Sequence, residues 1–282
     1  MTHKTMNIKG NLMTCDHPIV MGILNNTPDS FYCDSRNQTE RAITERIETI
    51  LREGGEIVDI GGYSSRPDAK FVTAEEEMQR LAFALKIVNK QFPDLIVSVD
   101  TFRAEIAREC VEQYGAAIIN DISGGQIDEE MFATVARLRV PYILMHMRGT
   151  PQTMQQFTDY TDMQGEMMRY FAEKIATLRA LGVNDIILDP GFGFSKTTEQ
   201  NYQLMAQLEE YQQFDLPLLV GMSRKSMIYR LLDSTPQESL NGTTVLNTFA
   251  LLNGADILRV HDVREAVEAV RIVDQIKKHQ RV

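Results

Sequence analysis

Eight short apolar runs recur along the chain, and each ends in a polar residue followed by a loop. The runs are rich in Ile and Val, and none alternates cleanly between polar and apolar residues. This pattern is typical of parallel strands that are covered on both faces. We therefore expect strands at residues 19–24, 57–61, 96–100, 117–121, 142–146, 186–189, 218–222 and 257–261.

Helical segments with a 3.6-residue period lie between these runs. Three of them place four apolar residues on one face: Ile43, Ile47, Ile50 and Leu51; Ile106, Cys110, Val111 and Tyr114; and Val267, Val270, Val273 and Ile276. Eight strand–helix repeats favour a (β/α)8 TIM barrel over a doubly wound sheet. No linker with a shift in composition interrupts the sequence, so we expect residues 1–282 to form a single domain. Residues 6–14 predict a short N-terminal hairpin that closes the bottom of the barrel.

Composition argues against several classes of function. Lys and Arg total 29 and Asp and Glu total 39, so the net charge is −10, and long basic runs are absent. We therefore expect no nucleic-acid partner and no binding to an anionic membrane surface. No run approaches the ~18 apolar residues of a membrane helix, and the first residues lack the apolar core of a secretory signal. Three widely spaced cysteines, Cys15, Cys33 and Cys110, fit a reducing compartment, and we expect a cytoplasmic protein.

In a TIM barrel the active site lies at the carboxyl ends of the strands, here called the rim. The expected rim residues are polar: Asn25, Ser64-Ser65-Arg66, Asp100, Asn120-Asp121, His146, Asp189, Ser223-Arg224-Lys225-Ser226, Arg259 and His261. Each has a plainer explanation. Asp100 could cap the following helix, His146 could be a core histidine, and Arg224 with Lys225 could be a solvated first turn. Those explanations weaken when they must account for every strand end at once.

Several motifs are absent. The sequence contains no H-E-x-x-H, no H-x-H at the first strand, no G-x-x-x-x-G-K-[ST] and no G-x-S-x-G. The segment Gly191-Phe192-Gly193 lacks the third glycine of a dinucleotide fingerprint. A zinc hydrolase, a P-loop enzyme, a nicotinamide enzyme and an α/β hydrolase are therefore not favoured.

Eight segments resemble, in order, the signatures of the dihydropteroate synthase family of pterin-binding TIM barrels. They are 21–31 (MGILNNTPDSF), 59–67 (DIGGYSSRP), 98–101 (SVDT), 119–121 (IND), 144–147 (LMHM), 188–194 (LDPGFGF), 223–226 (SRKS) and 259–263 (RVHDV). The resemblance covers about residues 19–276. Tyr63 stands where the family commonly has Glu, Ser65 where it has Thr, and Asp68 and Ser195 where it has Gly.

This resemblance implies a transferase of folate biosynthesis and a target of sulfonamides. The family joins (7,8-dihydropterin-6-yl)methyl diphosphate to 4-aminobenzoate, giving 7,8-dihydropteroate and pyrophosphate. The implied mechanism is dissociative and assisted by Mg²⁺, with Asn25 as the metal ligand. A homodimer is also implied, and the late helices, including residues 266–276, are apolar enough to form its interface.

The resemblance also implies roles for individual residues. Lys225, Arg259 and His261 would be catalytic, and the pterin diphosphate would contact Ser65, Asp100, Asn120, Asp189, Lys225, Arg259 and His261. The 4-aminobenzoate would contact Phe31, Arg66, Pro67, Phe194 and Ser226. Loops 26–37 and 63–73 are long and would form a lid. A pterin-dependent methyltransferase and a non-catalytic pterin-binding protein are the alternatives.

Overall fold

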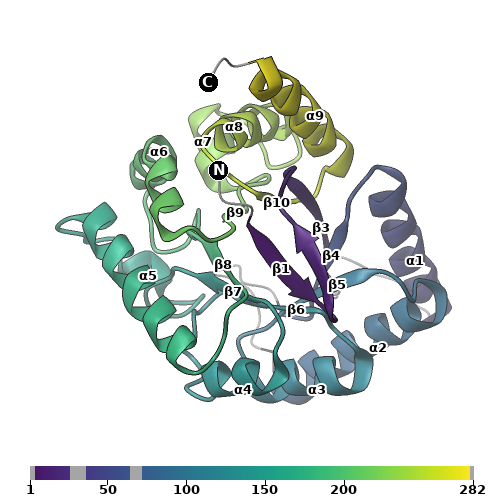
Figure 1. Cartoon of the computed structure of the whole chain (residues 1–282). Coiled ribbons are helices and arrows are strands. Elements are labelled where there is room, and N and C mark those ends of the chain that lie inside the picture. The colour runs from purple at the N-terminus through teal and green to yellow at the C-terminus, as the bar shows by residue number, and fades with distance from the viewer. Residues whose placement is uncertain (1–3, 26–35, 64–71, 280–282) are drawn as a thin grey trace.

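Eight parallel strands form a closed barrel in the computed structural model, which describes residues 4–25, 36–63 and 72–279 (Figure 1). In chain order they are β3 (Ile19–Asn25), β4 (Ile57–Gly61), β5 (Ile96–Asp100), β6 (Ile118–Asp121), β7 (Tyr142–Met145), β8 (Ile186–Asp189), β9 (Leu219–Val220) and β10 (Ile257–Val260). Neighbours in the sheet follow the order β8-β7-β6-β5-β4-β3-β10-β9, and a parallel bridge between Leu188 and Leu218 closes the ring. The predicted (β/α)8 class is confirmed. Only the seventh predicted strand is much shorter than expected.

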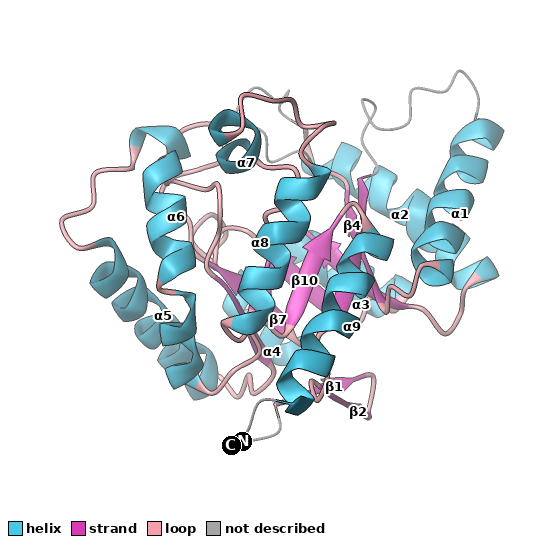
Figure 2. Cartoon of the chain, turned by 90° about the horizontal axis from the view of Figure 1, so that it is seen from above, coloured by secondary structure: helices cyan, strands magenta, loops and turns pink. Residues whose placement is uncertain are grey.

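Helices surround the barrel (Figures 1 and 2). They are α1 (Arg36–Arg52), α2 (Ala74–Gln91), α3 (Ala104–Tyr114), α4 (Met131–Leu138), α5 (Met163–Ala180), α6 (Thr198–Ala206), α7 (Ser226–Leu231), α8 (Leu240–Leu252) and α9 (Val263–His279). The predicted buried face of α1 is correct for Ile43, Ile47 and Ile50 but wrong for Leu51, which is 40% exposed. Leu51 lies about 100° around the helix from Ile50, which turns it away from the barrel. Ile276, near the end of α9, is exposed, unlike Val270 and Val273 of the same face.

An antiparallel hairpin closes the bottom of the barrel, as predicted (Figure 1). It consists of β1 (Thr5–Ile8) and β2 (Asn11–Thr14), joined by Lys9 and Gly10. Both turn residues have positive φ, 50° and 87°, which matches the right-handed twist of a two-residue hairpin. Met6 and Ile8 pack against the isoleucines at the lower ends of the barrel strands.

Residues that point into the barrel change from apolar to polar along several strands. On three adjacent strands, β4, β5 and β6, the lower inward residues are Ile57, Ile96 and Ile118, which pack in the bottom cluster. Two positions further along, the inward residues are Asp59, Ser98 and Asn120. The apolar bottom cluster thus excludes water from below the rim. Polar groups that are buried at the rim therefore need hydrogen-bond partners in the protein or in a ligand. No helix in the described ranges is long and apolar enough to cross a membrane.

Candidate active site

Arg259 of β10 bridges two carboxylates of β4 and β5, which neighbour each other in the sheet and lie beyond β3. Its Nε donates a hydrogen bond of 2.6 Å to Asp59 Oδ2, and its Nη2 donates one of 2.8 Å to Asp100 Oδ2. Asp59 is fully buried. Burial raises the pKa of Asp100 to about 7, although the positive charge of Arg259 acts in the opposite direction. The guanidinium is therefore fixed in place across the top of the barrel.

Asp100 does not cap the following helix, so the plainer explanation of this residue is wrong. Helix α3 begins after Arg103, which makes no side-chain cap. The N–H of Ala104 instead donates to Asp128 Oδ2 at 2.7 Å. Asp100 is consequently left to pair with Arg259.

Asn120 and Arg259 both donate a hydrogen bond to Asp59. Asn120 Nδ2 donates to Asp59 Oδ2 at 3.1 Å. Asn120 Oδ1 is buried and has no hydrogen-bond partner in the described structure. The sequence predicted Asn120 but assigned no role to Asp59. The available signal was a lone carboxylate in the apolar run 57–61, two residues after the inward-facing Ile57.

Asp189 ends β8 and begins the loop that connects it to α6. Its Oδ1 accepts the N–H of Gly191 at 2.8 Å. Burial raises the pKa of Asp189, and the charge of Lys225 lowers it. The carboxyl group is 6% exposed, as expected for a group that anchors a ligand at the rim.

Lys225 lies over the same loop. Its Nζ donates to the carbonyl oxygen of Phe192 at 2.6 Å and lies 4.6 Å from the centre of the Phe194 ring. Burial lowers the pKa of Lys225 to about 8, while Asp189 acts to raise it. Both predicted residues, Lys225 and Phe194, are thus in contact with each other.

The loop after β8 is wrapped around a second lysine, Lys196, whose role the sequence left open. Its Nζ lies 3.1 Å from the carbonyl oxygens of Gly191 and Phe194 and 3.1 Å from His146 Nδ1. Burial lowers the pKa values of both Lys196, to about 7, and His146. His146 is 3% exposed, so the core-histidine interpretation holds, and its contact with Lys196 stabilises the loop.

His261 and Arg224 lie where β9 and β10 meet the rim. His261 Nδ1 is 3.0 Å from Ser223 Oγ, and burial together with the charge of Arg259 lowers the pKa of His261 to about 4. The imidazole is therefore neutral at neutral pH. Arg224 pairs with both carboxylate oxygens of Asp262, at 2.7 and 2.8 Å, so it is not part of a solvated turn.

The structure gathers most of the described site residues into two connected groups. One joins Asp100, Asn120 and Arg259 through Asp59, and the other joins Asp189, Phe194 and Lys225 through the loop after β8. Ser226 begins α7 directly after Lys225. Asp121 is not part of either group, because it binds Tyr142 and its own loop. Four predicted residues, Phe31, Ser65, Arg66 and Pro67, lie outside the described residues, as does most of the expected lid.

The rim fits a magnesium ion only if the substrate supplies ligands. The described ranges contain no group of three His, Cys, Asp or Glu side chains arranged to hold a metal. Asn25, the predicted ligand, is half-buried at the end of β3 and is paired in register with Gly61. Mg²⁺ retains several waters and binds through few protein groups together with substrate phosphates, so one amide oxygen is compatible with it.

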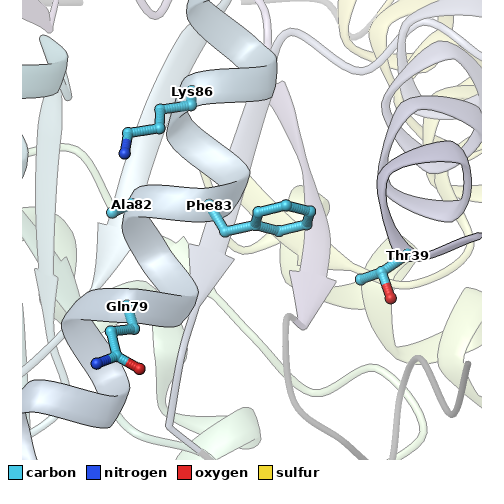
Figure 3. Close-up of a pocket in the computed structure, with 5 residues that line it drawn as sticks. All are labelled: Thr39, Gln79, Ala82, Phe83 and Lys86. Carbon is cyan, nitrogen blue, oxygen red and sulfur yellow. The ribbon is translucent and has the colours of Figure 1, made fainter. Parts of the chain in front are cut away.

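A cavity of about 420 Å³ lies between α1 and α2, away from the rim. It is lined by Thr39, Gln79, Ala82, Phe83 and Lys86, and Phe83 points from α2 towards Thr39 of α1 (Figure 3). Among the residues that the structure describes, no rim residue lines it, and Lys86 is its only ionisable lining residue. We therefore do not assign the reaction to this cavity.

Comparison with known proteins identifies close relatives. A family model described as a pterin binding enzyme matches residues 21–261. The dihydropteroate synthase of Escherichia coli is 42% identical over 268 residues, which are 94% of each chain, and that of Synechocystis is 44% identical over 260 residues, which are 91% of this chain and 89% of that protein. The Yersinia pestis dihydropteroate synthase, solved as a sulfonamide drug complex, superposes with a TM-score of 0.89 at 39% identity, covering 98% of this chain and all of that one. The Xanthomonas albilineans dihydropteroate synthase, solved with 4-aminobenzoic acid, gives 0.88 at 35% identity and covers 98% of this chain and 99% of that one.

Proposed function

The chain belongs to the dihydropteroate synthase family and carries that activity in folate synthesis, and we propose that its reaction takes place at the rim described above. The substrates are (7,8-dihydropterin-6-yl)methyl diphosphate and 4-aminobenzoate. The observation that carries this proposal is the buried network formed by the two groups described above, which brings acceptors and cations together. Asp100, Asn120 and Arg259 are held together by Asp59, and Asp189 and Lys225 both contact the loop after β8.

The acceptors of this network suit a pterin ring. A pterin presents adjacent N–H donors on one edge, and a buried carboxylate such as that of Asp189 can accept from two donors at once. Asn120 and Asp100 bind further ring nitrogens and the amino group, and Lys225 donates to the carbonyl side of the ring. Leaving such groups unpaired costs about 1–3 kcal/mol each, so a heterocycle with the wrong donors is rejected.

The positive charge of Arg259 suits the diphosphate. His261, as a neutral imidazole, and Ser65 bind the diphosphate through hydrogen bonds, and Asn25 would hold part of the coordination shell of Mg²⁺. When bound, the ion neutralises negative charge on the leaving oxygens. Arg259 is held by two carboxylates, so it requires little reorganisation when charge develops there.

The reaction is dissociative. The bond between the methylene carbon and the diphosphate oxygen breaks first, and the pterin ring delocalises the positive charge while Asp189 and Asn120 keep it in position. The arylamine nitrogen then attacks the methylene carbon, and the resulting ammonium group loses a proton to water. No enzyme nucleophile is required, because the ring itself stabilises the cation.

The 4-aminobenzoate lies beside the loop after β8. Its ring contacts Phe194 together with Phe31 and Pro67, and its carboxylate binds near Ser226 and Arg66. The support from the described residues is the place of Phe194, which is 8% exposed at the rim and in contact with Lys225. The 4-aminobenzoic acid and sulfonamide complexes of the relatives support the same ligand classes here.

The protein is proposed to be a cytoplasmic homodimer. Seven of the twelve exposed large apolar side chains of the described residues lie on α7, α8 and α9 or directly after α7: Leu231, Leu232, Val245, Phe249, Leu252, Ile272 and Ile276. Those three helices lie side by side in both views (Figures 1 and 2). An apolar surface of this kind favours a protein partner, and we propose a second copy of the chain. Cys15 and Cys110 are free thiols, in keeping with a reducing compartment.

A direct assay tests the proposed reaction. The purified protein is mixed with the dihydropterin diphosphate, 4-aminobenzoate and Mg²⁺, and release of pyrophosphate and formation of dihydropteroate are followed. We expect turnover that sulfonamides inhibit in competition with 4-aminobenzoate. Arg259→Ala should weaken binding of pyrophosphate much more than binding of a pterin without diphosphate. Equal losses for the two ligands would contradict the assignment of Arg259, and no turnover by the folded protein would contradict the proposed reaction.

A further inference from the structure

Asp59 is a buried carboxylate that contacts neither substrate in the proposed reaction. It lies in the middle of β4 and is fully buried. One of its oxygens, Oδ2, accepts two hydrogen bonds, from Arg259 Nε at 2.6 Å and from Asn120 Nδ2 at 3.1 Å. The two donors come from β10 and β6, on opposite sides of β4 in the sheet. A single oxygen atom thus connects two residues that we assign to different parts of one substrate.

The contact with Asn120 determines which way its amide is turned. A carboxylate only accepts hydrogen bonds, so the amide must direct its Nδ2 towards Asp59. Its Oδ1 is then left on the other side as a buried acceptor without a partner among the described residues. An unpaired buried acceptor is unfavourable, and an N–H donor of a bound ring would satisfy it. With the opposite orientation, Asn120 would present donors and would repel such a ring.

The contact with Arg259 determines where its guanidinium lies. Asp59 holds Nε, and Asp100 holds Nη2 at 2.8 Å. The remaining N–H groups of the fork are thereby given a fixed direction for an anionic ligand. Asp100 alone would leave the guanidinium free to rotate about one contact.

We propose that Asp59 is a positioning residue that orients both the pterin-binding amide of Asn120 and the diphosphate-binding guanidinium of Arg259. The inference rests on the proposed function, because it takes the ligands of Asn120 and Arg259 from there. Loss of an ion pair with a purely structural role would leave ligand binding unchanged, whereas loss of Asp59 weakens binding of both the pterin and the diphosphate. For this role the hydrogen-bond acceptor at the position of Oδ2 matters more than the negative charge of Asp59.

The test compares two substitutions of similar size. Asp59→Leu removes the acceptor, whereas Asp59→Asn retains one, because its amide oxygen can take the place of Oδ2. Binding of a pterin without diphosphate and binding of pyrophosphate with Mg²⁺ are measured separately by calorimetry. We expect Asp59→Leu to weaken both by about tenfold or more and Asp59→Asn to weaken each by no more than about threefold. Equal losses in the two variants, or no loss for either ligand in a folded Asp59→Leu protein, would overturn the inference.

Ser98→Ala is the matched control. Ser98 faces Asp59 in register on β5, is equally buried, and its hydroxyl has no partner in the described structure. It should leave both affinities unchanged. If Ser98→Ala lowered the two affinities as much as Asp59→Leu does, any change near Asp59 would disturb the site. That result would contradict the positioning role.

Two further variants separate this inference from the proposed function. Asn120→Ala should weaken pterin binding and Arg259→Ala pyrophosphate binding. If these two variants weaken binding as expected and Asp59→Leu weakens binding of neither ligand, only the role of Asp59 is contradicted. If Asn120→Ala and Arg259→Ala both leave binding unchanged, the proposed function is contradicted, and the role of Asp59 with it.

Should Asp59→Leu not fold, the unaltered protein provides the second measurement. The side-chain amide protons of Asn120, assigned by their loss in Asn120→Ala, should include one that is protected from solvent exchange with and without pterin. Rapid exchange of both protons in the free protein would overturn the inference.

Discussion

The ammonium group of Lys225 is a group of the site whose protonation can be followed a little above neutral pH. It contacts the Phe192 carbonyl oxygen and the Phe194 ring, and burial lowers its pKa to about 8. The charged groups that act on it are Asp189 and Asp100, which raise the pKa, and Arg259, which lowers it. The proposed role of Lys225 as a donor to the pterin carbonyl requires the protonated form.

Pterin affinity should therefore fall as the pH rises above about 8. Below that pH the amine is protonated and the affinity should change little through this group; above it the dissociation constant should rise about tenfold per pH unit. Lys225→Met should bind pterin more weakly and should lack this alkaline limb in calorimetric titrations between pH 6 and 10. Asp100, with a pKa of about 7, titrates below the alkaline limb, so the two proteins are compared by their slopes above about pH 8. An unchanged alkaline limb in Lys225→Met would contradict the role.

At the scale of elements, the loop after β8 is held in a conformation that few residues adopt. Gly191, Gly193 and Ser195 all have positive φ, at 71°, 81° and 46°. Lys196 holds the loop from inside through the carbonyl oxygens of Gly191 and Phe194. The loop supplies the Phe192 carbonyl for Lys225, so its shape sets the place of that ammonium.

The crowding at Gly191 can be measured against a glycine of similar backbone conformation. A Cβ at Gly191 would lie 2.1 Å from the carbonyl oxygen of His146, whereas one at Gly182, with φ of 87°, would meet nothing within 4 Å. Gly182→Ala should lower the free energy of unfolding by about 1–2 kcal/mol through φ alone. Gly191→Ala should lower it by a further ~1–3 kcal/mol because of the clash, and should weaken pterin binding. Equal losses in chemical denaturation would show that the loop moves aside freely.

At the scale of the whole molecule, the barrel and its polar rim could be predicted from the sequence, whereas contacts between distant residues could not. The eight strands follow from buried apolar runs, and the polar rim from the residues at their ends, because both depend on local patterns. Asp59 and Lys196 were given no role, because their importance comes from contacts with Asn120, Arg259 and His146, which are distant in sequence. The alternative explanation of Asp100 as a helix cap was wrong for the same reason, since Arg259 lies 159 residues further along the chain. Leu51 was wrongly placed because periodicity does not say where a buried stripe ends.

The apolar surface of α7, α8 and α9 makes a prediction about the assembly. Val245 and Ile272 are 58% and 59% exposed, and each is repeated one turn later by another exposed apolar residue, Phe249 and Ile276. Such stripes are stable in water when a second copy covers them, because association removes their apolar area from solvent. Val245→Glu combined with Ile272→Glu should convert the proposed dimer to a monomer in sedimentation equilibrium. Leu181→Glu, at an exposed residue that follows α5, should leave the proposed dimer intact. A monomeric unaltered protein, or a double variant that remains dimeric, would show that this surface is not the interface.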